Sequence, residues 1–337
     1  MSEGKLRVAL MGVGAIAQVV HLPVLNELDD VELTAVCDVD HVRANALAAR
    51  FGIPHIFRAD EDVFKSDLID AIIICTPSYL HEEQAIAAME AGKHVLVEKP
   101  LALSAAAVER VIAAAERTDR TLMVAMNNRY RPDTVALRPF AQNGELGDVF
   151  LTRGAWLNRK MRVVRPTWRH RLATAGGGAM MDLGVQSLDL CLWTLGFPEA
   201  ESVMTHMHYP EGMEVEDNAG IIVRLKNGAG ISLTVSWSLV AERDRHYMRV
   251  LGTRGSGAIS PLAVFKEVET GQIIDVTPTV SLGRENLYTA SYRQELTHFV
   301  NVATGQADEP LPREQIQIMR VVEAAYRSAA EKREVVV

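Results

Sequence analysis

The chain has few cysteines, no long apolar run and no excess of basic charge, and each shortage excludes a class of protein. Its three cysteines, Cys37, Cys75 and Cys191, are far apart and form no CxxC pair. This spacing argues against a disulfide framework or a zinc knuckle and suits a reducing cytoplasm. No stretch reaches the ~18 apolar residues of a membrane span, and the N-terminal apolar run is too short for a signal peptide. We therefore expect a cytoplasmic protein without membrane contact.

Basic charge is scarce as well. The chain has 35 Lys and Arg against 43 Asp and Glu, a net charge of −8, so a nucleic-acid partner, which binds to clustered basic side chains, is not expected. What is present is an ordinary globular composition, with 48% hydrophobic and 23% charged residues. A length of 337 residues suggests about two domains.

Residues 1–126 alternate short apolar runs with segments of helical spacing. The apolar runs predict strands buried on both faces of a parallel sheet, at 5–11, 31–38, 70–77, 94–100 and 121–126. Helices are predicted between them, at 15–28, 40–51, 79–91 and 104–117. Pro23 is expected to kink or shorten the first helix. This alternation predicts an α/β domain with a doubly wound parallel sheet, the Rossmann architecture.

Residues 127–337 have a different pattern. In 229–239, apolar and hydroxyl side chains alternate with a period of two, which is typical of a strand covered on one face. Asn227-Gly228 predicts a hairpin with 219–225. Further strands are predicted at 149–157, 201–209, 246–252, 263–269 and 272–276, and helices at 179–195, 289–303 and 312–332. We expect an α+β domain with an open, mostly antiparallel sheet, whose last helix is a candidate to pack back on the first domain.

The segment GVGAIA has the spacing G-x-G-x-x-G/A, with small residues at Gly12, Gly14 and Ala17. It follows a predicted strand and opens a predicted helix, which is the context of a dinucleotide-binding turn. Gly12 permits the tight turn, Gly14 lets the backbone approach a pyrophosphate, and Ala17 allows close packing of helix on strand. The first N–H groups of the helix and its dipole favour phosphate. The simpler alternative is a turn without a ligand.

Asp38 ends the second predicted strand, where the dinucleotide fingerprint has a carboxylate for the ribose. This carboxylate accepts hydrogen bonds from both ribose hydroxyls and repels a 2′-phosphate, so NAD is favoured over NADP. Arg43, one turn into the next helix, keeps NADP open as an alternative, although a solvated helix face is the simpler interpretation of that arginine.

The run HVLVEKP places Glu98 and Lys99 at the carboxyl end of a buried strand, the edge where such sheets bind ligands. Pro100 favours an extended backbone at Lys99 and so aims its side chain. A lysine at this edge is a candidate base that takes a hydroxyl proton while hydride leaves the same carbon. A base of this kind works best with a pKa of ~7–8, which burial and a cationic nicotinamide both favour. The alternative is a surface lysine in a loop.

In the predicted helix over 179–195, Asp182, Gln186 and Asp189 are spaced i, i+4 and i+7 and are expected on one face. Three glycines at 176–178 precede the helix and let a loop pass close to a ligand or another backbone. The functional interpretation is a polar face that binds substrate hydroxyls through Asp182. The alternative is a solvated face with Asp182 favouring the helix dipole.

Taken together, four stretches and Asp38 resemble the Gfo/Idh/MocA family of sugar and polyol dehydrogenases. The stretches are GVGAIA, CTPSYLH (75–81), VEKPLA (97–102) and GGGAMMDLGVQSLDLCLWTLG (176–196). The resemblance implies a Rossmann domain, an open sheet that often forms the subunit interface, and hydride transfer between a nicotinamide and a carbohydrate or cyclitol carbon. It also implies that Lys99 is the catalytic lysine and that the chain forms a homodimer or homotetramer.

The family motif D-x-G-x-H is matched at Asp182 and Gly184, but Gln186 stands where most active members have histidine. Glutamine forms hydrogen bonds but does not titrate near neutral pH. We rank three explanations in order: Lys99 transfers the proton alone while Gln186 orients the hydroxyl; another histidine, with His170 the best placed, takes over; or dehydrogenase activity has been lost.

The predicted site residues fall into three groups. Lys99, Asp182 and Gln186 are the catalytic candidates. The cofactor candidates are Gly12, Val13, Gly14, Ala15, Ile16, Asp38, Thr76, Pro77, His81, Glu98, Lys99 and Asn127. The substrate candidates are Lys99, Arg129, Trp168, His170, Asp182 and Gln186. No metal site is predicted, because His206 and His208 lack a third ligand.

We expect an NAD(P)-dependent oxidoreductase that acts on a sugar, sugar acid or cyclitol. Two other functions remain open. One is an NAD-dependent glycoside hydrolase on the same scaffold, which releases no net NADH. The other is a regulatory protein that binds nucleotide or sugar without turnover, an interpretation that Gln186 supports and Lys99 opposes.

Overall fold

The computed structural model describes residues 4–160, 167–269, 271–282 and 285–337. They form two compact units. Unit 1 comprises the described residues within 1–127 and 288–315, and unit 2 comprises those within 128–287 and 316–337. Each unit is built on one sheet.

The sheet of unit 1 is parallel, with the strand order β3-β2-β1-β4-β5-β6. Its strands are β1 (Leu6–Met11), β2 (Val31–Cys37), β3 (His55–Phe57), β4 (Ala71–Ile74), β5 (His94–Glu98) and β6 (Leu122–Ala125). The apolar runs β1, β4 and β5 are almost completely buried, as strands covered by helices on both faces must be. The predicted doubly wound sheet is confirmed. Only β3 was not predicted, because its three residues lie at the sheet edge, are not buried and carry no apolar pattern.

Helices cover this sheet. They are α1 (Leu22–Leu25), α2 (His41–Phe51), α3 (Asp60–Lys65), α4 (His81–Glu90), α5 (Ala105–Thr118) and α9 (Leu287–Ala303). A π-helical segment, Ala17–His21, leads into α1, and the N–H of Leu22 bonds to the carbonyl of Ala17. The wide π turn comes directly before Pro23, and α1 ends at Leu25, so the predicted helix over 15–28 is shortened as expected.

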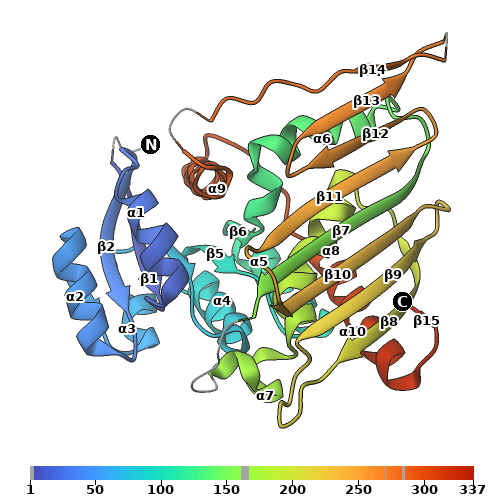
Figure 1. Cartoon of the computed structure of the whole chain (residues 1–337). Helices are drawn as coiled ribbons and strands as arrows, with labels where there is room; N and C mark the ends of the chain where they lie inside the picture. The colour runs from blue at the N-terminus through green and yellow to red at the C-terminus, as the bar shows by residue number, and fades with distance from the viewer. Residues whose placement is uncertain (1–3, 161–166, 270, 283–284) are drawn as a thin grey trace. The chain divides into compact units, whose positions relative to one another are not determined.

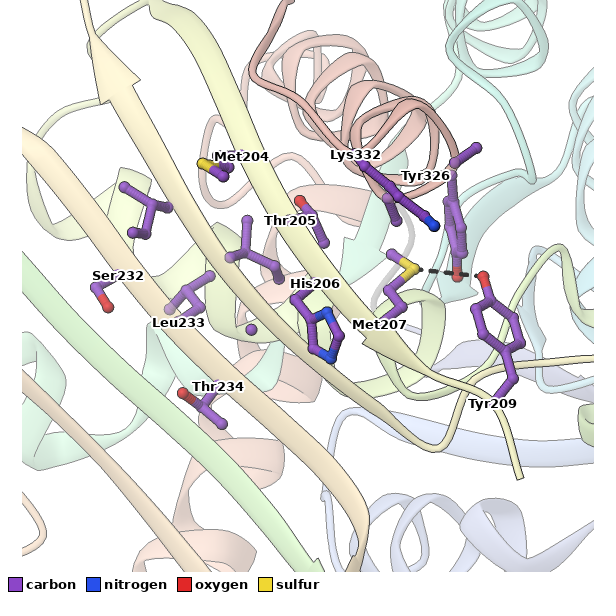
Figure 2. A pocket seen from close by; sticks show the side chains of 15 residues that line it. Met204, Thr205, His206, Met207, Tyr209, Ser232, Leu233, Thr234, Tyr326 and Lys332 are labelled. Carbon is purple, nitrogen blue, oxygen red and sulfur yellow. Dashed lines mark hydrogen bonds between the residues drawn. The ribbon is translucent and has the colours of Figure 1, made fainter. Parts of the chain in front are cut away.

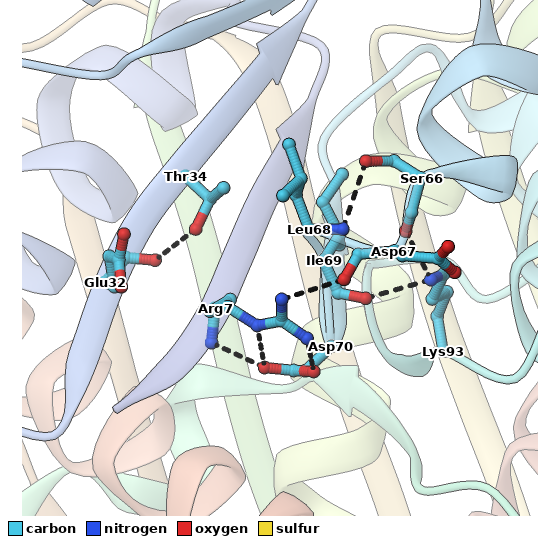
Figure 3. A network of polar contacts seen from close by, with 9 residues as sticks. All are labelled: Arg7, Glu32, Thr34, Ser66, Asp67, Leu68, Ile69, Asp70 and Lys93. Carbon is cyan, nitrogen blue, oxygen red and sulfur yellow. Dashed lines mark hydrogen bonds and ion pairs between the residues drawn. The ribbon is translucent and has the colours of Figure 1, made fainter. Parts of the chain in front are cut away.

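A polar network joins β1 to β4 at the amino-terminal edge of this sheet (Figure 3). The guanidinium of Arg7 donates to both carboxylate oxygens of Asp70, with Nε 2.9 Å and Nη2 2.6 Å away. Nearby, Lys93 donates to the carbonyls of Ser66 and Ile69. These groups lie at the end of the strands opposite to the ligand-binding edge, so we assign them a structural role.

The sheet of unit 2 has the strand order β14-β13-β12-β11-β7-β10-β9-β8-β15 over the described residues (Figure 1). The strands are β7 (Val149–Arg159), β8 (Ala200–His208), β9 (Asn218–Leu225), β10 (Gly230–Leu239), β11 (Arg245–Gly252), β12 (Gly255–Ile259), β13 (Ala263–Glu267), β14 (Ile273–Asp275) and β15 (Val335–Val336). Neighbouring strands are antiparallel except β7 and β10, which are parallel. The predicted open, mostly antiparallel sheet is confirmed, and so is the β9–β10 hairpin around Gly228.

The helices of unit 2 are α6 (Pro132–Gln142), α7 (Leu172–Ala175), α8 (Val185–Thr194) and α10 (Glu314–Glu331). Both α6 and α8 pack on one face of the sheet (Figure 1). The predicted helix over 179–195 is present but begins as a π-helical segment, Met180–Gly184, before it continues as α8. Within the described part of the chain, no helix combines the length and the apolarity that crossing a membrane requires.

The alternation of β10 holds at its start and fails near its end. Ile231, Leu233 and Val235 are buried, as predicted, but Ser236 is buried too and Trp237 is half-buried. The pairing with β7 shifts register after Ser236, and such an irregularity re-aims the following side chains. Trp237 therefore leaves the core stripe in which its sequence position placed it.

Candidate active site

The predicted cofactor residues of unit 1 gather at the carboxyl edge of its sheet. Gly12 follows β1, Asp38 follows β2, and Lys99 follows β5, each as the next residue after the strand. Thr76 and Asn127 come two residues after β4 and β6. These strands are neighbours in the order β2-β1-β4-β5-β6, so the residues line one edge, where doubly wound sheets bind their ligands.

The turn after β1 fits a pyrophosphate. Gly12 has a φ of +83°, and a Cβ added to it would lie 2.8 Å from backbone atoms of Cys75 and Thr76, so only glycine fits there. A Cβ added to Gly14 would meet no atom within 4 Å. The protein's own packing therefore does not require glycine at position 14, whereas a ligand close to the backbone does. The first turn of the following helix begins at Ala15, and its N–H groups, which have no acceptor within a helix, are of the kind that bind phosphate.

The carboxylate of Asp38 organises the same corner. One oxygen accepts the N–H of Val13 at 2.7 Å, and the other accepts the N–H of Asp40 at 2.7 Å and a guanidinium N–H of Arg43 at 2.9 Å. Asp38 thus ties the glycine turn to the end of β2. Arg43 is more than a solvated side chain on α2, because it pairs with the residue expected to bind the ribose.

At the end of β5, Lys99 is partly exposed between the buried residues Glu98 and Pro100. The peptide bond from Lys99 to Pro100 is cis. Burial raises the pKa of Glu98, but the hydrogen bond with His21 and the nearby positive charges outweigh burial, so its pKa lies below the usual value. His21 was not predicted, since a lone histidine inside a helix has no motif that reveals its partner.

His81 joins two loops of this edge. Its ring nitrogens lie 2.7 Å from the carbonyl oxygen of Pro100 and 2.9 Å from that of Thr76. The ring is completely buried, which lowers its pKa, although the two carbonyls act in the opposite direction. Asn127 is also held from within unit 1, through a bond from its side-chain amide to Ser291. His81 and Asn127 therefore shape the edge, and direct contact with a cofactor stays a prediction for both.

Unit 2 brings several of the predicted substrate residues together. Among residues 177–192, Asp182 is the one that is not buried. The indole N–H of Trp237 donates to the Asp182 carboxylate at 3.2 Å, and the side-chain amide of Gln186 donates to the Asp182 carbonyl at 3.2 Å. The ring of His170 lies 6.1 Å from that of Trp237. Asp182 is thus the partly exposed centre of a cluster that includes Gln186, His170 and Trp237, the last of which was not predicted as a site residue.

Asp189 does not belong to this cluster. It is 1% exposed and forms an ion pair with Arg129, whose guanidinium also lies over the ring of Phe197. The π-helical start of the helix turns its side chains by a different angle from a regular α-helix, so the i, i+7 spacing does not place Asp189 beside Asp182. Trp168 is half-buried and stacks against Arg169. Substrate contacts of Arg129 and Trp168 stay predictions.

A pocket of about 890 Å³ lies in unit 2 and contains none of the predicted site residues (Figure 2). Its lining includes Met204, His206, Tyr209, Tyr326 and Lys332. Most of it is formed by β8, β9 and β10 together with α10. The described residues also contain no cluster of three or more His, Cys, Asp or Glu side chains able to hold a metal ion.

Known proteins resemble this chain over its whole length. D-glucoside 3-dehydrogenase of Escherichia coli (strain K12) is 27% identical, with 98% of this chain and 97% of the relative covered. Myo-inositol 2-dehydrogenase of Thermotoga maritima is 25% identical, with 98% of each chain covered. The crystal structure of GenD2 from gentamicin A biosynthesis in complex with NAD matches with a TM-score of 0.86 and 28% identity, covering 99% of this chain and 97% of that one.

Two family models match the chain. The model described as an oxidoreductase family with an NAD-binding Rossmann fold matches residues 6–126, and that family's C-terminal alpha/beta domain matches residues 141–337. The second match alone covers more than half of the chain. The protein therefore belongs to the Gfo/Idh/MocA family of oxidoreductases, and its N-terminal part is an NAD-binding Rossmann domain.

Proposed function

We propose that the protein is an NAD-dependent dehydrogenase that oxidises one CH–OH group of a sugar, sugar acid or cyclitol. The observation that carries this proposal is the carboxyl edge of the parallel sheet, where the glycine turn, Asp38 and Lys99 follow neighbouring strands. The named activities of the relatives, on a D-glucoside and on myo-inositol, support the substrate class.

The residues that would hold the dinucleotide follow from the shape of the glycine turn. Gly14 leaves room for the pyrophosphate beside the first N–H groups of the helix, among them those of Ala15 and Ile16. Asp38 is the candidate for the ribose hydroxyls, and Thr76, Pro77, Glu98 and Asn127 are the candidates farther along the edge. When bound, the nicotinamide supplies the acceptor for a hydride.

Proton transfer is assigned to Lys99. Its ammonium group, once deprotonated, would take the hydroxyl proton of the substrate, and the residue's partial exposure after a buried strand supports this role. Asp182 would accept hydrogen bonds from substrate hydroxyls, since it is the one partly exposed residue among 177–192. Trp237 holds that carboxylate by its indole N–H.

Gln186 would orient the substrate rather than transfer a proton. Its amide N–H bonds to the Asp182 carbonyl, and an amide has no titration near neutral pH. This arrangement supports Lys99 as the group that transfers the proton alone. His170 remains the second choice because it contacts Trp237, which itself holds Asp182.

We also propose that the protein is a homodimer or homotetramer that associates through the sheet of unit 2. One face of that sheet is covered by helices, and the other carries the exposed apolar side chains of the cross-strand neighbours Met204 and Ile222. Exposed apolar side chains among polar ones on an uncovered sheet face are typical of an interface between subunits. Light scattering of the wild type and of Ile222→Lys tests the assembly, and a monomeric wild type would contradict it.

The free cysteines support a cytoplasmic location.

The function is tested by a spectrophotometric screen of sugars, sugar acids and cyclitols with NAD⁺ and with NADP⁺, using the wild type and Lys99→Met. We expect net NADH formation with at least one polyhydroxylated compound and none with the variant. Glycoside cleavage that requires NAD⁺ but leaves no net NADH would establish the hydrolase instead. Cofactor binding without turnover over the whole panel would support a regulatory protein.

A further inference from the structure

Glu216 is a completely buried carboxylate in the loop between β8 and β9. Its oxygens accept the backbone N–H groups of Gly178, at 3.0 Å, and Met180, at 2.8 Å, and the hydroxyl of Tyr326 on α10, at 2.9 Å. Its own carbonyl accepts the N–H of Ala179 at 2.9 Å. One residue therefore binds three successive N–H groups at the start of the helix that carries Asp182.

The glycines before that helix are required by this contact. A Cβ added to Gly178 would lie 1.8 Å from the carbonyl oxygen of Glu216, and one added to Gly177 would lie 1.8 Å from the hydroxyl of Tyr326. A side chain at position 178 would push the loop away from the Glu216 backbone, and one at position 177 would displace the Tyr326 hydroxyl. The glycine run thus serves close approach of two parts of unit 2, which is one of the two alternatives that its sequence leaves open.

The same loop also holds the partner of Asp182. The carbonyl of Asp217, the residue after Glu216, accepts the backbone N–H of Trp237 at 2.8 Å, and the indole of Trp237 donates to Asp182. Glu216 therefore fixes the backbone on one side of the Asp182–Trp237 hydrogen bond, and Asp217 fixes the backbone on the other side. Within the helix, the N–H of Asp182 bonds to the carbonyl of Gly178, which links Asp182 directly to the segment that Glu216 holds.

We propose that Glu216 is a positioning residue, which sets the place of the Asp182 carboxylate relative to Trp237 and thereby the geometry of substrate binding. It acts through Gly178, Met180 and Asp182 and touches neither substrate nor cofactor. The effect of Glu216 on substrate turnover rests on the proposed function, whereas its effect on the Asp182–Trp237 hydrogen bond does not.

Two variants separate positioning from folding. Glu216→Gln keeps the shape of the side chain but turns an amide N–H₂ toward backbone donors, and Glu216→Ala removes the acceptors altogether. Glu211→Gln is the matched control, because Glu211 lies in the same loop and is exposed.

Each protein is examined by thermal unfolding, NADH binding by fluorescence titration, steady-state kinetics on the best substrate of the screen, and the ¹H–¹⁵N signals of the tryptophan indoles. The chain has four tryptophans, and Trp237→Phe assigns the relevant signal.

We expect the indole signal of Trp237 to shift in Glu216→Gln, with kcat/KM lowered about tenfold, and kcat/KM lowered about 100-fold in Glu216→Ala, as for misplacement of a binding group by about 1 Å. NADH affinity should stay within twofold of the wild type, since the Rossmann domain is unchanged. Glu211→Gln should match the wild type in every measurement.

An unchanged Trp237 signal together with wild-type kcat/KM in Glu216→Gln would overturn the proposal. So would a parallel fall of NADH affinity and kcat/KM, which would indicate a general loss of folding. If Glu216→Ala does not fold, Glu216→Gln decides the matter. If the wild type turns over no substrate, the proposed function fails, but the indole signal still tests whether Glu216 positions Asp182.

Discussion

The Nε2 atom of His21 lies 2.8 Å from Oε1 of Glu98, and both side chains are buried. The ring of Tyr292 packs edge-on against His21, with centroids 5.7 Å apart. The residue before the proposed catalytic lysine is therefore held by a buried pair that reaches back to the helix after the glycine turn. The contribution of this pair to the free energy of unfolding can be measured by replacing His21.

Replacing His21 by leucine should destabilise the protein by about 3 kcal/mol at pH 7, because it leaves a buried carboxylate without its partner. Urea unfolding measures the loss. His55→Leu is the control in the same unit, since His55 is exposed, and it should change the free energy of unfolding by less than ~0.5 kcal/mol.

The loss in His21→Leu should depend on pH. The pKa of Glu98 is lowered in the folded protein, because the hydrogen bond with His21 outweighs burial. A group of this kind adds stability above its unfolded pKa of ~4.3 and loses that contribution as the pH falls through its lower folded pKa. The difference between wild type and variant should therefore shrink as the pH is lowered below ~4.3. A difference that stays constant down to the acid transition would contradict the assigned pair.

Alanine at Gly12 should lower the stability of the protein, whereas alanine at Gly14 should lower its affinity for NADH. Gly12→Ala forces a side chain into a left-handed backbone and against Cys75, so the free energy of unfolding should fall by about 2 kcal/mol or more. Gly14→Ala has open space for its methyl group, so stability should change by less than ~0.5 kcal/mol while NADH affinity falls about tenfold. Unfolding curves and NADH titration measure the two effects. Full NADH affinity in a folded Gly14→Ala variant would argue against the assigned pyrophosphate site.

Asp38→Ser should weaken NADH binding about tenfold, because it removes the carboxylate assigned to the ribose hydroxyls. NADPH binding should weaken less or improve, since the variant removes one of the two carboxylates that pair with Arg43 and removes a charge that repels a 2′-phosphate. Arg43→Ala is the companion variant and should increase the preference for NADH. Fluorescence titration with both cofactors measures the ratio of affinities, and an unchanged ratio in Asp38→Ser would refute the assignment.

Lys99→Met should lower kcat by 10²–10⁴-fold, roughly the contribution of a general base, and leave NADH affinity unchanged. Gln186→Ala should cost far less, since its amide only orients. Steady-state kinetics and NADH titration on both variants test this order. Normal turnover in Lys99→Met would exclude the proposed mechanism, and a larger loss in a His170→Ala variant would move the proton transfer to His170.

Local sequence patterns were sufficient to predict that Gly12, Asp38 and Lys99 lie at one edge of the parallel sheet. The apolar runs that end at Gly12, Asp38 and Lys99 predict buried parallel strands, and chain direction alone then places all three residues at one edge of the sheet. The hairpin at Asn227-Gly228 could be predicted for the same reason, because the turn residues and the period of two act over a few neighbouring positions.

Other features depend on contacts between distant segments. The partnership of Asp189 with Arg129 joins residues 60 positions apart, and nothing in the helical spacing of Asp182, Gln186 and Asp189 signals it. Trp237 follows a register shift in β10 that the alternating sequence does not contain. His21 and Glu98 are separated by 77 positions and have no motif in common.

The amino-acid sequence by itself determined the two kinds of sheet, the glycine turn and the placement of Gly12, Asp38 and Lys99 at one edge of the parallel sheet, because short-range periodicity, chain direction and backbone sterics govern all of these. Only the tertiary structure decided which side chains form hydrogen bonds with groups far away in the sequence. Packing joined Glu216 to the glycine run, Trp237 to Asp182 and His21 to Glu98. Burial makes an unpaired polar group costly, so the buried carboxylates of Glu216 and Glu98 acquire hydrogen-bond partners from segments that the fold brings beside them, at a distance along the chain that no local pattern records.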